Sequence, residues 1–219
     1  MLKRIKLKNS TALLLGIIFI SVGIGFGFYE YYVERKNKAF NEMNILLYES
    51  EKPDNIESEP QLEEKIEELN KNVEEPNVET PKHEIKYNYI GILEIPKLNL
   101  KQGFLDLNSR YNNVNYNITV IKGSTFPDQE NNNLILAAHS GACKICYFST
   151  LYKLSVGDDA YIYYKNIKHY YKIVNIYEVD KDGTVPIHRD YSKNVLTLIT
   201  CTKNSNTKQT VYILEEYNK

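Results

Sequence analysis

The strongest constraint on this chain is an uncharged segment of 21 residues, from Asn9 to Tyr29, that directly follows a basic start. A helix of about 20 apolar residues is long enough to cross the hydrocarbon core of a bilayer. The basic residues before the segment favour a cytoplasmic N-terminus, and Tyr29, Tyr31 and Tyr32 suit the membrane interface. We therefore expect residues 1–35 to form a basic cytoplasmic tip and a transmembrane anchor, with the rest of the chain outside the cell membrane.

A cleaved signal peptide is the alternative interpretation of this segment. The apolar run is long for a signal peptide, and no Ala-x-Ala-like cleavage site precedes Glu30. These two observations favour a retained, single-pass anchor.

Residues 36–83 have the composition of a stalk. Four of the seven prolines lie here, and residues 42–79 contain 13 acidic and 3 basic residues. A segment with this charge and low hydrophobicity cannot bury a core. Leu62, Ile66, Leu69 and Val73 have helical spacing, so we expect a solvated, acidic stalk that is partly disordered and partly helical.

Residues 84–219 are predicted to form a mainly β domain. Short alternating or continuous apolar runs are separated by turn residues, and the chain contains 19 tyrosines, which suit half-buried strands. Roughly eight strands with few helices indicate a β-barrel or sandwich. The expected strands are 89–96, 98–100, 114–120, 134–138, 160–164, 170–177, 195–201 and 210–214, with short helices near 110–113 and 147–154.

The overall charge and the cysteine count argue against two classes of protein, nucleic-acid-binding proteins and disulfide scaffolds. The net charge is −1, which gives no indication of nucleic acid binding. The three cysteines are an odd number, which argues against a disulfide scaffold.

Two of the predicted central strands end in residues that can carry out chemistry. Cys201 ends the strand 195–201, just before the turn-prone residues 203–206, and His139 follows the strand 134–138. A lone cysteine with apolar neighbours is often inert core filling. If both strands end at one rim of a barrel, however, the two residues can form a nucleophile and base pair.

Three motifs resemble those of the sortase family. The segment Thr197-Leu198-Ile199-Thr200-Cys201 resembles the sortase TLxTC signature, and residues 136–141 resemble the strand-end histidine motif. Residues 90–98 are similar to the family's opening strand. The resemblance covers about residues 87–217, and the basic start, the anchor and the stalk fit the same family.

The resemblance implies an eight-stranded sortase-type barrel and a cysteine transpeptidase. Such an enzyme of a Gram-positive-type bacterium cleaves an LPxTG-like sorting signal of a surface protein between Thr and Gly. Cys201 would form the acyl-enzyme and His139 would transfer protons, with Thr200, Ala138 and Ser140 beside the substrate. The acceptor would be an amine of a peptidoglycan precursor or of a pilin, and no cofactor is expected.

The chain departs from the family at one position. Sortases have an arginine early in the strand that follows the cysteine strand, whereas no arginine follows Cys201 here. Aligning residues 210–213 with that strand puts Gln209 at the arginine position, next to Lys208. Gln209 can donate amide hydrogens but carries no charge. Lys208 carries a charge but lacks the planar, two-pronged guanidinium group of arginine. We expect Gln209 to take the role, with Lys208 as the alternative.

Other functions are compatible with parts of the sequence. Cys143 and Cys146 form a Cys-x-x-Cys motif, so His139, Cys143, Cys146 and Cys201 could together bind zinc in a structural module. The missing arginine also fits a catalytically impaired, sortase-like binding domain. Some sortases bind calcium between loops such as those with Asp158, Asp159, Asp180 and Asp182, but we interpret these as turn carboxylates and assign no metal.

Overall fold

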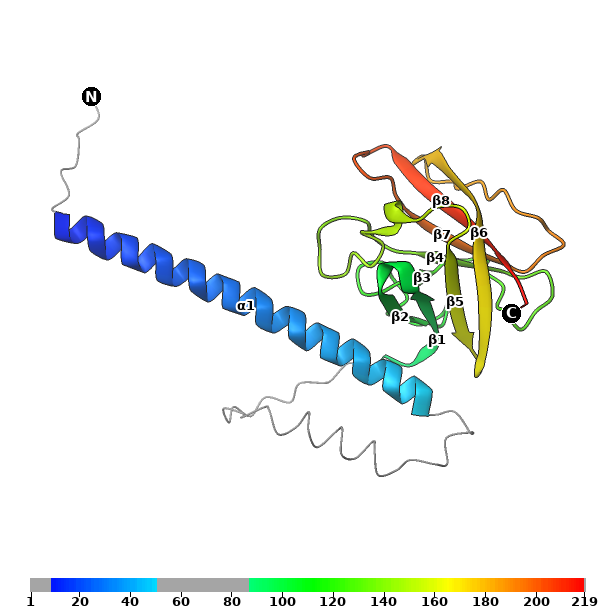
Figure 1. The fold of residues 1–219 in the computed structure, drawn as a ribbon, viewed down its shortest axis with the longest axis horizontal. Coiled ribbons are helices and arrows are strands. Elements are labelled where there is room, and N and C mark those ends of the chain that lie inside the picture. The colour runs from blue at the N-terminus through cyan, green and yellow to red at the C-terminus, as the bar shows by residue number, and fades with distance from the viewer. Residues whose placement is uncertain (1–8, 51–86, 219) are drawn as a thin grey trace. The chain divides into compact units, whose positions relative to one another are not determined.

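The computed structural model describes residues 9–50 and 87–218. The chain divides into two compact units at Glu42/Met43. The first unit consists of most of the helix α1 (Asn9–Ser50), and the second of the end of that helix and the β domain (Figure 1).

Helix α1 contains a stretch that is long and apolar enough to cross a membrane. Eight of its large apolar side chains between Ile17 and Phe28 are exposed, as a lipid-facing helix requires. The helix continues to Ser50, past residue 36, where we expected the stalk to begin. The reason is that no glycine or proline occurs between Gly27 and Pro53. The expected helical stripe at Leu62–Val73 lies outside the described residues.

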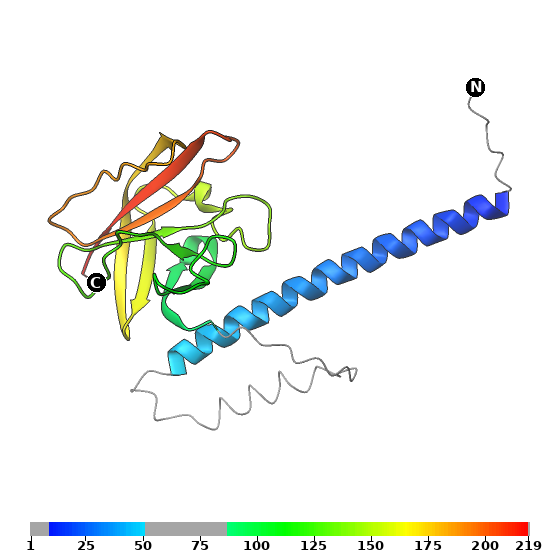
Figure 2. The same cartoon turned by 180° about the vertical axis from the view of Figure 1, so that it is seen from behind.

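The β domain is one eight-stranded sheet that coils into a nearly closed barrel (Figures 1 and 2). The strands follow the spatial order β2-β1-β5-β6-β8-β7-β4-β3, and an isolated bridge between Phe104 and Ile118 joins the region of β2 to that of β3. The strands are β1 (Tyr89–Ile95), β2 (Leu100–Leu105), β3 (Thr119–Val120), β4 (Asn133–Ala137), β5 (Asp159–Tyr164), β6 (Ile167–Asp180), β7 (Val195–Cys201) and β8 (Lys208–Glu216).

The only helices of the described β domain are two 3-10 turns, η1 (Pro96–Leu98) and η2 (Leu151–Lys153). The helix expected near Arg110–Asn113 is therefore wrong, and the strand expected at 114–120 is reduced to Thr119 and Val120. Asparagine side chains explain both differences. The Asn112 side chain donates to Leu107 O and accepts from Val120 N, and Asn117 Oδ1 accepts from Ile118 N. These bonds replace a regular helix or ladder.

Three apolar clusters fill and cover the barrel. The largest lies inside it and includes Phe104, Leu136, Ile162, Leu198 and Tyr212. The second lies on the other face of β4, β7 and β8, and consists of Ile135, Val195, Ile199, Val211 and Ile213. Because successive side chains of a strand alternate between faces, Cys201 belongs to the face of this second cluster.

The third cluster joins the last turns of α1 to β1 and β2 within the second unit. Ile45 is buried with Tyr89, Ile92 and Leu105. The Tyr48 hydroxyl donates to Tyr163 O at 3.3 Å, and Glu49 pairs with Lys101 at 2.8 Å. The end of the helix is therefore part of the fold of the β domain.

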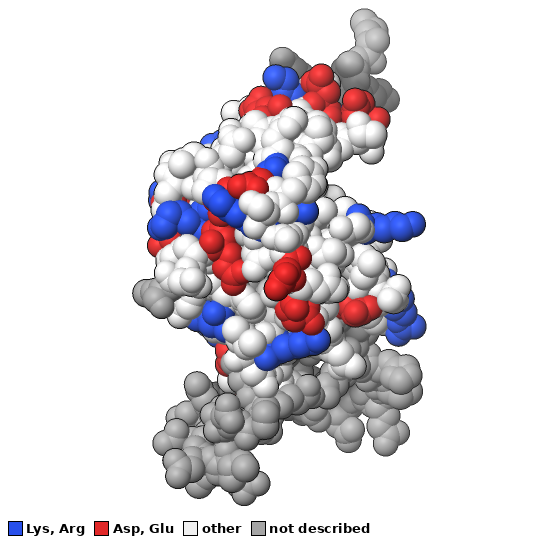
Figure 3. Space-filling model, turned by 90° about the vertical axis from the view of Figure 1, so that its right-hand side faces the viewer, with Lys and Arg blue, Asp and Glu red and all other residues white. Residues whose placement is uncertain are grey.

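The charged side chains are mixed in sign on the face shown in Figure 3. Basic and acidic side chains lie next to one another there rather than in separate areas. Ion pairs such as Lys172–Asp159 and Lys193–Glu215 show the same local pairing of opposite charges on the barrel. The face in Figure 3 therefore offers no broad surface of a single charge.

Candidate active site

Cys201 is the last residue of β7 and is partly exposed. All three cysteines of the chain lie in its described part, and Cys143 and Cys146 form a disulfide, so Cys201 carries the one free thiol. β7 is buried from Val195 to Thr200 and pairs with β4 on one side and β8 on the other. The thiol therefore stands at the end of a rigid central strand.

The pairing of β4 with β7 brings His139 to the same edge of the sheet. This pair is parallel, and its last aligned residues are Ala137 and Ile199. His139 and Cys201 each lie two residues beyond those partners, at the same end of neighbouring strands. His139 Nε2 lies 3.3 Å from Asn115 Oδ1, and the His139 carbonyl accepts from Phe148 N.

The residues just before the pair lock the two strand ends together. The Thr200 hydroxyl is buried and donates to Ala138 O at 2.9 Å. Ala138 N donates to Ile199 O at 3.4 Å. The hydrogen bonds of Thr200 and Ala138 thus fix the backbone next to Cys201 and His139. Ser140 follows His139 and is partly buried.

Gln209 and Lys208 lie on opposite faces of β8. Gln209 is the register partner of Cys201 on β7 and of Val179 on β6, so the three residues share a face. Lys208 is the partner of Asp180, and its ammonium lies 3.4 Å from Glu178. The structure thus brings Gln209 to the side of Cys201 and turns Lys208 to the other side.

Lys181 is a residue that the sequence did not reveal as part of the site. It follows β6, and its amide extends the ladder by donating to Thr207 O at 2.7 Å. Its ammonium lies 3.6 Å from Cys201 Sγ. Nothing in the neighbouring residues Asp180 and Asp182 indicates that Lys181 contacts Cys201. The contact depends on the spatial order β6-β8-β7, which the sequence does not show.

A long segment, residues 181–194, covers the face of the sheet that carries Cys201. Val185 and Ile187 pack against the second apolar cluster. The Tyr177 hydroxyl donates to Pro186 O and accepts from His188 N, and burial raises the pKa of Tyr177. These contacts hold the segment close to β6 and β8.

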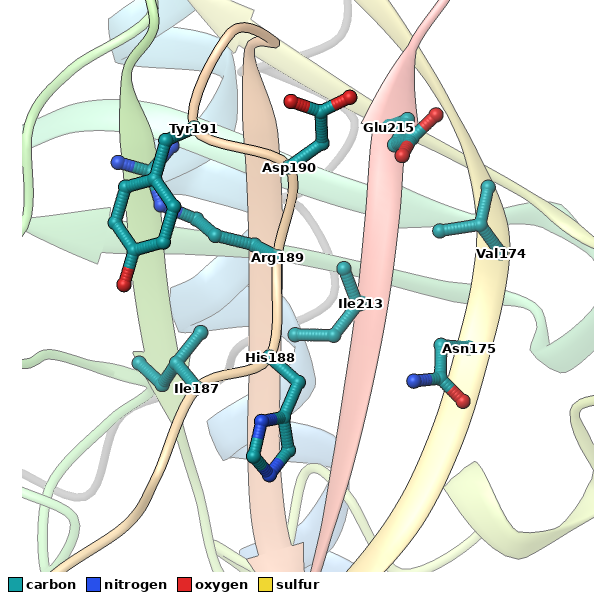
Figure 4. Close-up of a pocket in the computed structure, with 9 residues that line it drawn as sticks. All are labelled: Val174, Asn175, Ile187, His188, Arg189, Asp190, Tyr191, Ile213 and Glu215. Atoms are coloured by element: carbon teal, nitrogen blue, oxygen red, sulfur yellow. The ribbon is translucent and has the colours of Figure 1, made fainter.

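An open depression of about 620 Å³ lies between this segment and the strands β6 and β8. Figure 4 shows His188 and Ile187 on the covering segment, opposite Ile213 of β8 and Asn175 of β6. Ile213 is four residues from Gln209 along β8, or about 13 Å at the usual rise of a strand. The depression and Cys201 therefore lie along one face.

Several residues considered as metal ligands have other partners in the described structure. Cys143 and Cys146 are bonded to each other, so in this state their sulfurs are not thiolate ligands for the zinc set that we considered. Asp158 pairs with Lys97, which lowers its pKa, and hydrogen bonds from Thr184 lower the pKa of Asp182. The described residues contain no group of three or more His, Cys, Asp or Glu that could hold a metal ion.

Comparisons with known proteins agree with the sequence motifs. The sequence model of the Sortase domain matches residues 93–215. The structure is similar to that of sortase C1 from Streptococcus agalactiae, with 27% identity, a TM-score of 0.54, and coverage of 61% of this chain and 70% of that one.

Two further structures show the same fold at lower identity. Sortase A from Corynebacterium diphtheriae, a lid mutant, is 19% identical, with a TM-score of 0.54 and coverage of 74% of this chain and 82% of that one. A Clostridium perfringens sortase D5 transpeptidase is 22% identical, with a TM-score of 0.51 and coverage of 72% and 89%. No curated protein matches this chain.

Proposed function

This chain belongs to the sortase family, and from that premise we propose that it is a membrane-anchored transpeptidase that uses Cys201 to cleave an LPxTG-like sorting signal. The observation that carries the assignment of residues is the parallel pairing of β4 with β7. It supports a Cys201–His139 pair because both residues follow the last register partners by the same two positions.

The proposed reaction has two acyl transfers. Cys201 attacks as the thiolate, its sulfur bonds to the threonine carbonyl carbon, and the C–N bond to glycine breaks. Protonated His139 gives its proton to the leaving amine. In the second transfer, His139 takes a proton from the incoming amine, which bonds to the carbonyl carbon, and the C–S bond breaks to restore the thiolate. The thioester keeps the acyl group reactive enough for an amine to accept it.

The face that carries Cys201 is the proposed binding surface for the sorting signal. Its floor is the second apolar cluster, and residues 181–194 form a wall along it. Gln209 lies on this face and has two amide hydrogens to donate to the bound signal or to the oxyanion. Thr200, Ala138 and Ser140 shape the end of the surface where the bond is cleaved.

The helix α1 supports a single-pass anchor, and the basic residues before it favour a catalytic domain outside the cell. In this proposal residues 1–35 are the tip and anchor and 84–219 the catalytic domain, and residues 36–83 are the stalk, whose first part, the end of α1, packs on the catalytic domain. The donor is a surface protein with the sorting signal, and the acceptor is an amine of a peptidoglycan precursor or a pilin. The helix would hold the enzyme where both substrates occur.

The first test measures cleavage and transfer directly. Full-length protein in detergent is incubated with a panel of fluorogenic LPxTG-type peptides, with and without an amine acceptor. We expect Cys201-dependent cleavage, and a new amide product by mass spectrometry only when the amine is present. The Cys201→Ala variant should lose at least about a thousandfold in rate, because the thioester cannot form.

A Cys143→Ser/Cys146→Ser double variant is the matched control, since it also replaces cysteines but leaves Cys201. It should retain cleavage of the peptide panel. If no peptide is cleaved in a Cys201-dependent way while the panel still binds, the chain is a sortase-like binding domain and the enzymatic proposal fails.

A further inference from the structure

The proposed active site has a nucleophile and a histidine, but no arginine follows Cys201 in the sequence. The four arginines are Arg4, Arg35, Arg110 and Arg189. Arg189, on the covering segment, donates to the carbonyl groups of Asn131, Asn132 and Lys193. Its guanidinium also lies 4.5 Å from the centre of the Tyr191 ring, so it holds the segment in place rather than facing Cys201.

The lysines that are nearest in sequence to Cys201 are engaged elsewhere. Lys203 lies with its ammonium 3.6 Å from the centre of the Tyr152 ring. Lys208 pairs with Glu178 on the opposite face of β8. Gln209 shares the face of Cys201 but carries no charge.

Lys181 combines a charge with the correct position. Its backbone amide binds Thr207 O, which continues the β6–β8 pairing by one residue beyond Asp180 and Lys208. By the alternation of a strand, its side chain then lies on the same face as Val179, Gln209 and Cys201. Its ammonium is within hydrogen-bonding distance of Cys201 Sγ, at 3.6 Å.

We propose that Lys181 is the cation of this active site and stabilises the negative charge that develops beside Cys201. This inference rests on the proposed function of Cys201. The attacking group is a thiolate, and negative charge then develops on the oxygen of the carbonyl group that the sulfur attacks. An ammonium that touches the sulfur lies near both charges and donates hydrogen bonds without forming a covalent bond.

In this arrangement β8 and the end of β6 contribute different groups to the site. Gln209 supplies neutral amide donors from β8, and Lys181 supplies the charge from the end of β6. Because β8 lies between β6 and β7, the two side chains approach Cys201 along one face of three neighbouring strands.

The test uses the free thiol itself and needs no peptide substrate. Full-length protein in detergent, without reducing agent, is alkylated with neutral iodoacetamide or with anionic iodoacetate, and the ratio of the two rates is measured. Cys201 is the one free thiol, so the rates report on it alone. A cation beside the sulfur accelerates the anionic reagent selectively, and the iodoacetamide rate corrects for accessibility.

In Lys181→Met we expect the iodoacetate-to-iodoacetamide ratio to fall about fivefold, the effect of one charge near 4 Å at a solvated site. Lys181→Arg should keep the ratio. Lys165→Met is the matched control, because Lys165 lies beyond the opposite end of β6, and it should also keep the ratio. An unchanged ratio in Lys181→Met would overturn the inference, whether or not any peptide is cleaved.

A kinetic measurement then tests the catalytic role. With a cleaved peptide, Lys181→Met should lower kcat about tenfold or more with little change in KM, because the charge acts on the transition state. Lys181→Arg should recover most of kcat. A lower alkylation ratio with wild-type kcat would overturn the catalytic role of Lys181 and leave the proposed function of Cys201 intact.

Discussion

At the scale of residues, the alternation of side chains along β8 decides whether Lys208 or Gln209 lies beside Cys201. The two are neighbours in sequence, but β8 turns them to opposite faces, and Lys208 pairs with Glu178. Sequence alignment alone leaves both open, since it has no information about faces. The register with Cys201 favours Gln209 as a donor at the site.

The prediction for Gln209 concerns its amide hydrogens. Gln209→Ala and Gln209→Met should both lower kcat/KM for the sorting-signal peptide about a hundredfold, the scale of one lost oxyanion donor. Gln209→Met roughly keeps the size and removes the donor without adding a charge, so a similar loss in both variants identifies the hydrogen bond as the cause. Gln129→Ala, an exposed glutamine on a loop, is the control. Full activity of Gln209→Ala would remove Gln209 from the site.

At the scale of elements, the sequence predicted the strands that carry Cys201, the proposed nucleophile, and lead to His139. The strands expected at 134–138 and 195–201 form β4 and β7, within one residue of the expected bounds. The run at 114–120 was not predictable in the same way, because Asn112 and Asn117 bind backbone groups with their side chains. Lys181 was also beyond prediction, since only the strand order brings β6 near β7.

The disulfide is another element that the sequence left open. The odd number of cysteines argued against a disulfide scaffold, and the structure has one local bridge between Cys143 and Cys146. The two cysteines are three positions apart in the loop that follows His139. The bridge therefore fixes a local turn and does not link distant parts of the domain. The Cys146 amide also donates to Cys143 O, at 3.1 Å.

The covering segment 181–194 gives a prediction at this scale. Tyr177→Phe removes the hydroxyl that binds Pro186 O and His188 N. We expect KM for the peptide to rise severalfold with kcat nearly unchanged. The lost hydrogen bonds should also destabilise the fold by about 1–2 kcal/mol, measured as a lower Tm. Tyr191→Phe on the same segment keeps its ring against Arg189 and should behave as wild type; an equal rise of KM in both variants would contradict this role of Tyr177.

At the scale of the whole molecule, the end of α1 belongs to the folded β domain. The sequence suggested a domain that starts at residue 84, but Ile45 and Tyr48 pack on β1, β2 and β5 within the second unit. Composition could not show this, because the contacting residues lie in a segment that reads as the start of an acidic stalk.

We therefore predict that a fragment of residues 43–219 is more stable than one of residues 84–219. Burial of Ile45 alone contributes about 2 kcal/mol, and thermal unfolding should show a Tm several degrees higher for the longer fragment. Ile45→Asp in the longer fragment should cancel the difference, whereas Met43→Ala, at an exposed position of the same helix, should preserve it. Equal Tm values for the two fragments would show that the helix end adds nothing to the fold.

The parallel pairing of β4 with β7 also determines when the enzyme becomes active during folding. It joins Asn133 to Val195 and Ala137 to Ile199, segments that are far apart in the chain. Contacts between distant segments form late, because a long loop must be ordered before they stabilise the structure. Cys201 meets His139 only once β7 has paired with β4, so a chain in which this pair has not yet formed exposes a thiol without its proposed catalytic partner.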